Sequence, residues 1–196
     1  TAMFLSWRKS RARRRAVTLR AEAAARPEAV EAGRALVERF PDEAWPPIGA
    51  MVAGYRPVRG EIDPLALMET FLCEQARLCL PCVTGPDKPL AFRAWTPGDP
   101  LRKAAFGVEE PLENAPEGSP SLVLAPLLAF DEEGRRLGYG GGFYDRTLDA
   151  LRSRGGVTAV GLAYEAQKSE RVPSGPRDQR LDWVVTEQAA YRCQAK

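Results

Sequence analysis

The sequence predicts an α/β protein, in which helices cover both faces of a mainly parallel, Rossmann-like sheet to form a three-layer sandwich. Short apolar runs of strand length alternate with stretches of helical periodicity, which is typical of this fold class. The length of 196 residues suits one well-buried core better than two. No internal repeat or linker divides the chain. We therefore expect a single domain over residues 1–196, with a basic helical segment, residues 1–40, packed on the rest.

The N-terminal elements follow from composition and periodicity. Residues 7–40 are mostly Ala, Arg, Glu, Val and Leu, which predicts a long or broken helix interrupted at Pro27 and ended by Pro41. Residues 48–55 form a short apolar run and predict a buried strand. Residues 64–77 place apolar side chains at helical intervals and predict a helix.

The remaining elements are short. Residues 78–84 and 90–95 are apolar runs that predict two strands, joined by a turn at Gly85-Pro86-Asp87. Residues 96–121 are rich in Pro, Gly and Glu and predict a long surface loop, a kind of segment that often binds ligands. The pattern then predicts a helix over residues 144–154 and strands over residues 122–125, 157–164 and 181–186.

The composition excludes several kinds of site. The chain contains no histidine, which excludes Ser-His-Asp and Cys-His nucleophilic sites and histidine-ligated zinc. No uncharged apolar run approaches the ~20 residues that cross a bilayer, so we expect no membrane partner. The N-terminus lacks a secretory signal pattern, and four cysteines then fit a reducing compartment, so we expect a cytoplasmic protein.

The motif Cys79-Leu-Pro-Cys82 could indicate metal or redox chemistry. No second CxxC completes a zinc tetrad, and the pair lies in a strand-like apolar run. We therefore favour buried, unreactive thiols.

Charge is concentrated at the N-terminus. Residues 1–20 hold seven of the 28 basic residues and none of the 26 acidic ones, although the net charge is only +2. Such a segment could bind phosphates of a nucleotide or of a nucleic acid. A solvated helix face is the plainer interpretation, and we do not expect nucleic acid to be the partner.

Residues 129–146 carry the most informative pattern, with four glycines among the five residues 138–142. Glycines permit positive φ and leave backbone amides unshielded, so this loop could surround a phosphate, and a helix starting near Phe143 would direct its positive end at the same anion. Arg135 and Arg136 add positive charge. The loop matches neither GxxxxGK[ST] nor GxGxxG, so it indicates neither a P-loop nor a dinucleotide fold. A plain glycine turn with Asp145 capping a helix is the alternative.

Two aspartates are candidate metal ligands. Asp145 directly follows the glycines, and Asp182 lies among apolar neighbours in a predicted strand. Mg²⁺ typically takes one or two carboxylates together with phosphate oxygens and water. A salt bridge to Arg146 or Arg180 is an equally good interpretation.

Residues 126–145 closely resemble a block of the 5-formyltetrahydrofolate cyclo-ligase family, which has the form Pro-Gly-x-Ala-Phe-Asp followed by Gly-x-Arg-Leu-Gly-x-Gly-x-Gly-Tyr-Tyr-Asp. Gly60-Glu-Ile-Asp63, Phe106-Gly-Val-Glu-Glu-Pro111 and the segment 172–187 are similar to further family elements. The resemblance implies conversion of 5-formyltetrahydrofolate to 5,10-methenyltetrahydrofolate, driven by ATP with Mg²⁺ and releasing ADP and phosphate. It implies a reduced folate and ATP as the partners, and we expect a monomer.

The resemblance also implies residue roles. Arg136 and Tyr144 would be catalytic, and Asp145 with Asp182 would hold the metal. Glu61 would hydrogen-bond the pterin ring of the folate, and Phe106 would stack on that ring unless it is a core residue. The nucleotide would contact Lys9, Arg13, Arg136, Leu137, Gly138, Tyr139, Gly140, Gly141, Gly142, Phe143 and Tyr144, and the folate would share Tyr139, Gly140, Gly141, Gly142 and Phe143.

Some positions depart from the family pattern. Its N-terminal Lys-x-x-x-Arg motif fits Lys9 and Arg13, yet the neighbouring Arg8 and Arg11 leave the register open. Arg177-Asp178 replaces a His-Asp pair. A non-catalytic or differently selective homologue that keeps the phosphate loop is therefore the main alternative, and nucleic-acid binding through the basic segment is a further one.

Overall fold

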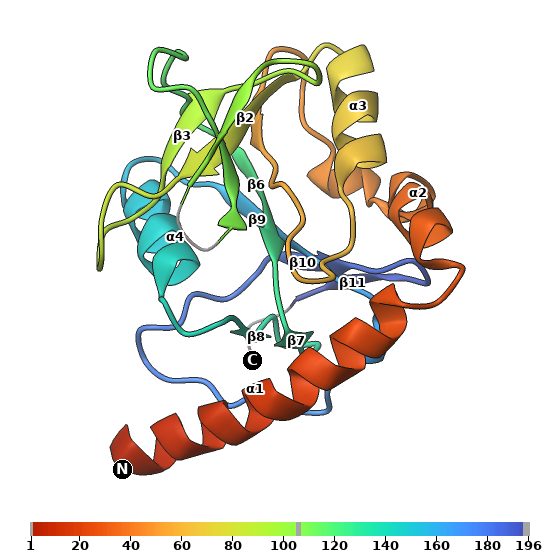
Figure 1. Cartoon of the computed structure of the whole chain (residues 1–196), viewed down its shortest axis with the longest axis vertical. Coiled ribbons are helices and arrows are strands. Elements are labelled where there is room, and N and C mark those ends of the chain that lie inside the picture. The colour runs from red at the N-terminus through yellow and green to blue at the C-terminus, as the bar shows by residue number, and fades with distance from the viewer. Residues whose placement is uncertain (1, 105–106, 194–196) are drawn as a thin grey trace.

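The computed structural model describes residues 2–104 and 107–193 and has three layers (Figure 1). In these residues a seven-stranded sheet has the order β11-β10-β9-β6-β1-β2-β3. Its central strands are parallel, and the edge strands β3 and β11 are antiparallel to their neighbours. The α/β class with a mainly parallel sheet is thereby confirmed. The strands are β1 (Met51–Ala53), β2 (Arg77–Cys82), β3 (Ala91–Ala94), β6 (Leu122–Pro126), β9 (Thr158–Leu162), β10 (Trp183–Val185) and β11 (Ala190–Arg192).

Helices cover both faces of this sheet. Figure 1 shows α2 and α3 on one side and α4 on the other, while α1 lies alongside the short strands β7 and β8. The predicted N-terminal helix is broken near Pro27, as its sequence indicates. The helices are α1 (Ala2–Ala24), α2 (Ala29–Arg39), α3 (Leu65–Cys73) and α4 (Phe143–Ser153), with 3-10 turns η1 (Asp42–Ala44) and η3 (Glu165–Gln167). No helix of the described residues is long and apolar enough to span a bilayer.

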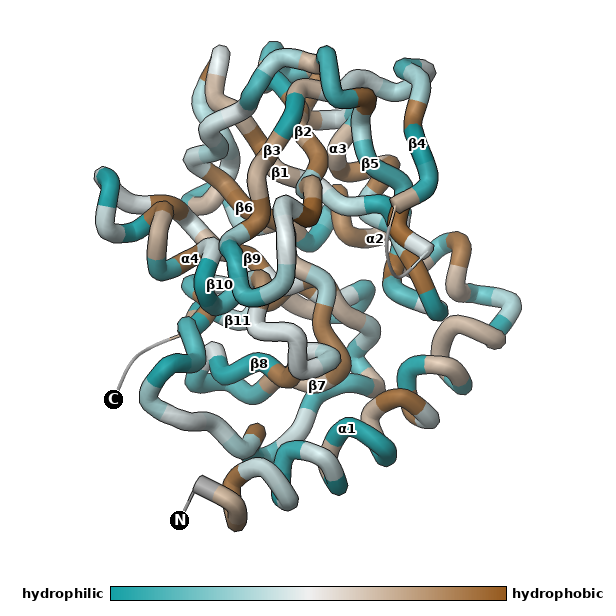
Figure 2. Tube along the Cα trace, turned by 60° about the vertical axis from the view of Figure 1, so that its left-hand side comes forward, coloured by the Kyte–Doolittle hydropathy of each residue, from teal (hydrophilic) through white to brown (hydrophobic). Residues whose placement is uncertain are grey.

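The core lies on both faces of the sheet. On β6, Leu122 and Leu124 pack with residues of α2 and α3, whereas Val123 and Ala125 pack with Leu148 of α4. Strands buried on both faces read as continuous apolar runs, which is why the sequence revealed them. Figure 2 shows the central strands largely hydrophobic, whereas hydrophilic and hydrophobic residues alternate along α1.

The strand order creates a site for a ligand. Numbered along the chain, the five parallel strands of the described sheet lie in the order 2-1-3-4-5, which is a doubly wound arrangement. The winding reverses between β1 and β6. Ligands of such sheets bind outside the carboxyl ends of the strands at this reversal. Much of the predicted site lies in the two segments that follow these strands, residues 54–61 and 127–142.

The structure adds short elements that the sequence pattern missed. Residues 96–121 are not one loop, because β4 (Leu101–Lys103) and β5 (Glu109–Pro111) pair within them. Strands β7 (Ala129–Phe130) and β8 (Arg136–Leu137) form a hairpin before the glycine loop, which we define as residues 138–142. Strands of two or three residues are too short to show an alternation of apolar and polar side chains.

Candidate active site

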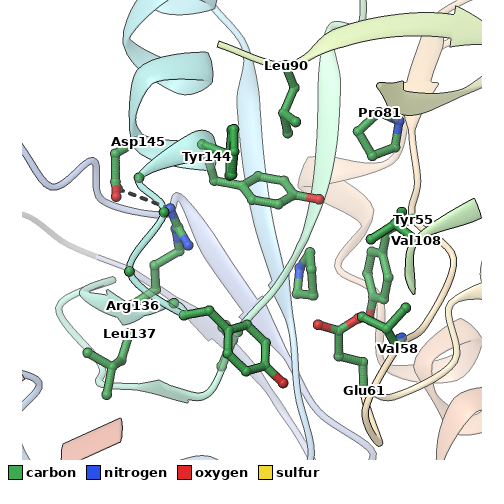
Figure 3. Close-up of a pocket in the computed structure, with 18 of the residues that line it drawn as sticks. Tyr55, Val58, Glu61, Pro81, Leu90, Val108, Arg136, Leu137, Tyr144 and Asp145 are labelled. Atoms are coloured by element: carbon green, nitrogen blue, oxygen red, sulfur yellow. Dashed lines mark hydrogen bonds and ion pairs between the residues drawn. The ribbon is translucent and has the colours of Figure 1, made fainter. Parts of the chain in front are cut away.

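A cavity of about 500 Å³ lies at the carboxyl ends of β1, β2 and β6, at the winding reversal. In Figure 3, Arg136 and Asp145 lie on one side of it, and Tyr55, Val58 and Glu61 lie on the other. The predicted site residues that line the cavity are Lys9, Arg13, Glu61, Arg136, Leu137, Gly138, Tyr139, Gly140, Gly141, Gly142, Phe143, Tyr144 and Asp145. The structure therefore brings together residues that are more than 100 positions apart in the sequence.

The glycine loop connects β8 to α4. Gly140 has φ 104° and Gly142, the N-cap of α4, has φ 68°, both in the left-handed region that favours glycine. The Arg13 Nε donates a hydrogen bond of 2.9 Å to the Gly138 carbonyl. Across the described residues, no protein acceptor takes a hydrogen bond from the backbone amides of residues 138–141. These amides line the cavity and can bind an anion there, together with the N-terminus of α4.

Arg136 is a buried cation beside this loop. Its side chain is 5% exposed, its Nη2 donates a hydrogen bond of 3.0 Å to Asp145 Oδ1, and its Cζ lies 5.3 Å from the centre of the Tyr144 ring. Its Nε is buried and has no hydrogen-bond partner among the described residues. Because buried N–H groups are almost always bonded, this donor indicates a missing acceptor, such as a phosphate oxygen.

Asp145 fits a divalent cation next to bound phosphates. It lies in the first turn of α4, and its carboxylate also accepts a hydrogen bond of 3.1 Å from the Gln179 amide. Mg²⁺ in nucleotide sites needs only one or two protein carboxylates, since phosphates and water complete its shell. The described residues contain no group of three or more acidic, Cys or His side chains that would form an all-protein metal cage.

Asp182 lies elsewhere, outside the described residues that line the cavity. Its Oδ2 accepts hydrogen bonds of 3.1 Å from Arg152 and 2.7 Å from the Ala159 amide. The structure thus gives Asp182 a salt bridge, to Arg152 rather than to either arginine named from the sequence.

The structure of α1 shows which basic residues of the N-terminal Lys/Arg motif reach the cavity. Lys9 and Arg13 line the cavity, whereas Arg8 and Arg11 are exposed and lie over the rings of Phe4 and Trp7, respectively. Lys9 forms an ion pair with Asp178. Burial alone would raise the pKa of Asp178, but the bonds from Lys9 and from the Gly175 amide lower it below its usual value. An anion that enters the cavity would compete with Asp178 for Lys9.

The opposite wall presents an acceptor and two hydroxyl groups. The Glu61 side chain is 7% exposed and accepts a hydrogen bond of 3.0 Å from the Val58 amide. Burial raises its pKa, against the lowering effects of that bond and of Arg20. Burial and the Glu61 charge raise the pKa of Tyr55, and they also raise that of Tyr144, so both phenols stay protonated.

Comparison with known proteins decides the family. A sequence model described as the 5-formyltetrahydrofolate cyclo-ligase family matches residues 6–187. The chain belongs to this family. Among the cyclo-ligases, that of Mycolicibacterium smegmatis is 35% identical over 168 residues, covering 82% of this chain and 85% of that one. That of Haemophilus influenzae is 36% identical over 128 residues, covering 63% of this chain and 68% of that one.

Solved structures agree with the cyclo-ligase assignment. The solution structure of Aquifex aeolicus 5,10-methenyltetrahydrofolate synthetase has a TM-score of 0.73 and 29% identity, and the alignment covers 96% of this chain and 94% of that one. A Mycoplasma pneumoniae 5,10-methenyltetrahydrofolate synthetase, at 23% identity and a TM-score of 0.68 over 91% of this chain and 98% of that one, shares the fold. Membership in the cyclo-ligase family makes the chain an enzyme.

Several cavity residues of this cyclo-ligase family member are absent from the sequence prediction. Tyr55, Arg56 and Arg59 line the cavity just after β1, so a rule that ligands bind where parallel strands end would have found them. Glu110 lines it from β5, a strand the sequence pattern did not reveal. Phe106, predicted to stack on the pterin, lies outside the described residues.

Proposed function

We propose that this chain converts 5-formyltetrahydrofolate to 5,10-methenyltetrahydrofolate, using ATP with Mg²⁺ and releasing ADP and phosphate. The observation that supports it most is that two kinds of binding group line one cavity: loop amides without a protein acceptor, and the buried acceptor Glu61 on the other wall. The first suits a triphosphate and the second suits the donor-rich pterin ring.

The triphosphate would lie along the glycine loop. The amides of residues 138–141 and the N-terminus of α4 supply hydrogen bonds and positive potential. Lys9, Arg13 and Arg136 surround the loop with three cations. Mg²⁺, when bound, would neutralise phosphate charge, and Asp145, which lines the cavity next to the glycine loop, would hold it. A role for Asp182 in holding the metal stays a prediction, and it would require that Asp182 release Arg152.

The folate would occupy the part of the cavity next to β1 and β2. Glu61 would accept hydrogen bonds from pterin N–H groups, and the protonated Tyr55 and Tyr144 hydroxyls can donate to its oxygen atoms. Apolar side chains of Pro81, Val83 and Leu90 also line the cavity and would contact the faces of the ring.

The chemistry needs orientation and charge neutralisation more than acid or base groups. The formyl oxygen would attack the γ-phosphorus, and ADP would leave. N10 would then attack the formyl carbon, the C–O bond would break to release phosphate carrying the former formyl oxygen, and N10 would lose its proton. Arg136 and the loop amides would stabilise negative charge during phosphoryl transfer, and Tyr144 would orient the substrate.

The proposal is tested by incubating the purified chain with 5-formyltetrahydrofolate, ATP and Mg²⁺, and measuring methenyl product by absorbance and ADP by a coupled assay. We expect one ADP for each methenyl product and no ADP when the folate is omitted. ATP binding without folate consumption would contradict the proposal and would support a homologue that keeps only the phosphate loop.

A further inference from the structure

A buried arginine of α1 contacts the segments on both sides of the cavity. The Arg20 residue is 1% exposed. Its Nη2 donates hydrogen bonds to the Arg59 carbonyl, at 2.9 Å, and to the Tyr139 hydroxyl, while its Nη1 lies 3.3 Å from the Leu127 carbonyl. Nη1 also lies 3.5 Å from Glu61 Oε1. One guanidinium therefore links the loops after β1 and β6 with the glycine loop.

We propose that Arg20 is a positioning residue that holds Glu61 against the folate and Tyr139 in the glycine loop, so that both binding sites form together. The inference rests on the proposed function, because it concerns the same cavity. Arg20 itself is not among the described cavity-lining residues, whereas Glu61 and Tyr139 are. It would thus act through these two side chains.

The geometry requires a guanidinium. Its planar group donates in several fixed directions, and here it reaches two carbonyl groups, a hydroxyl and a carboxylate at once. Its face also lies over the Tyr139 ring, with Cζ 5.2 Å from the ring centre. A lysine would keep the charge but not this set of directions.

The charge of Arg20 also opposes the effect of burial on Glu61. The other ionisable groups that face Glu61 are Arg59 from the loop after β1, Tyr55 from the end of β1 and Tyr144 from α4. Burial raises the pKa of Glu61, and Arg20 and Arg59 lower it. Removal of Arg20 should therefore raise this pKa further and protonate Glu61 at a higher pH.

The test compares Arg20→Met and Arg20→Lys with Arg14→Met, a matched change at an exposed arginine of the same helix that lies outside the cavity. We expect Arg20→Met to raise the KM for 5-formyltetrahydrofolate roughly 10- to 100-fold. We also expect the acid limb of its kcat/KM profile to move to higher pH. Arg20→Lys should restore the pH profile but only part of the KM, and Arg14→Met should match the unmodified chain.

A double-mutant cycle with Glu61 separates a positioning role of Arg20 from a role in folding. In a Glu61→Gln background, Arg20→Met should weaken folate binding, measured by calorimetry without ATP, much less than it does in the unmodified chain. Equal losses in both backgrounds, or an acid limb that stays in place in Arg20→Met, would overturn the inference. If Arg20→Met does not fold, Arg20→Lys takes its place in the cycle, and its loss of folate affinity should again be smaller in the Glu61→Gln background. If the unmodified chain binds 5-formyltetrahydrofolate but forms no methenyl product, the proposed function fails and the calorimetric cycle still tests Arg20; if it binds no folate, both proposals fail.

Discussion

Asp145 accepts hydrogen bonds from Arg136 and from the Gln179 amide, so its charge is compensated in the absence of a ligand. A cation bound to Asp145, as proposed, would have to share this carboxylate with Arg136. Under the proposed function, Asp145 would therefore have one set of partners in the free protein and another in the complex. Lys9, paired with Asp178, is in the same situation.

Asp145→Asn should lower kcat strongly, by roughly 100-fold or more, because an amide cannot neutralise the charge of the metal. The loss should be greatest at limiting Mg²⁺, which is measured by titrating the metal at saturating ATP and folate. Unchanged activity at low Mg²⁺ would mean that Asp145 serves only the first turn of α4.

Arg136→Ala should raise the KM for ATP by about tenfold or more and change the KM for the folate much less, because the buried Nε has only a ligand to bond to. Steady-state kinetics with each substrate varied in turn measures both constants. The reverse order would show that the glycine loop does not bind the nucleotide.

The thiols provide a test independent of activity. Burial and the neighbouring Cys82 raise the pKa of Cys79 to about 12, and burial with the Glu110 charge raises the pKa of Cys82 to about 11. Both groups are thus protonated at pH 8, and both are buried, so they should not react with a thiol reagent. The exposed Cys73 should react promptly in the native protein, and mass spectrometry should find the CxxC pair labelled only after unfolding. Rapid labelling of Cys82 would support the redox interpretation.

At the scale of elements, the glycine loop is defined by backbone conformation. A Cβ at Gly140 would be strained by its positive φ and would lie 3.2 Å from the Arg13 Cζ. Gly98 has a similar φ of 101° and open space around it, which makes it a matched control.

Gly140→Ala and Gly98→Ala should each lower the free energy of unfolding by about 1 to 2 kcal/mol, since both place a side chain in the left-handed region. Only Gly140→Ala should also weaken ATP binding, because only that change displaces Arg13 and the loop amides. Denaturant unfolding and calorimetric titration with ATP and Mg²⁺ measure the two effects. Equal ATP affinity in both variants would contradict the role of the loop.

The elements differ in how well their sequences predict them. Strands buried on both faces, such as β6 and β9, appear as apolar runs, and the break near Pro27 follows from proline chemistry. The pairs β4/β5 and β7/β8 are held by tertiary contacts over two or three residues, which leaves no periodic signal. Strand β11 is likewise three residues long.

Site residues that belong to a recognisable sequence motif were predictable. Residues that reach the site only through the packing of the fold were not. The glycine loop was found from its four glycines and Glu61 from the resemblance, and the structure brings them to one cavity. Arg20 lies in an alanine- and arginine-rich helix where nothing in the sequence distinguishes it from its exposed neighbours. Only the packing of α1 on the hairpin of β7 and β8 shows which arginine is buried.

At the scale of the whole molecule, the cavity forms where the winding of the sheet reverses. The β1 side supplies Glu61 and Tyr55, the β6 side supplies the glycine loop, and α1 supplies cations to both through Lys9, Arg13 and Arg20. The two substrates of the proposed reaction would thus meet between the two halves of the sheet. This arrangement explains how a chain without histidine could catalyse their reaction, because holding two reactants in contact accounts for much of the rate enhancement of such an enzyme.

The central claim is that one cavity binds the triphosphate and the pterin together, and a crystal structure with a non-hydrolysable ATP analogue, Mg²⁺ and 5-formyltetrahydrofolate tests it most directly. We predict phosphate oxygens within hydrogen-bond distance of the amides of residues 138–141 and of Arg136, and pterin nitrogens within hydrogen-bond distance of Glu61. A nucleotide bound away from the glycine loop, or a folate that leaves Glu61 without contact, would contradict the account.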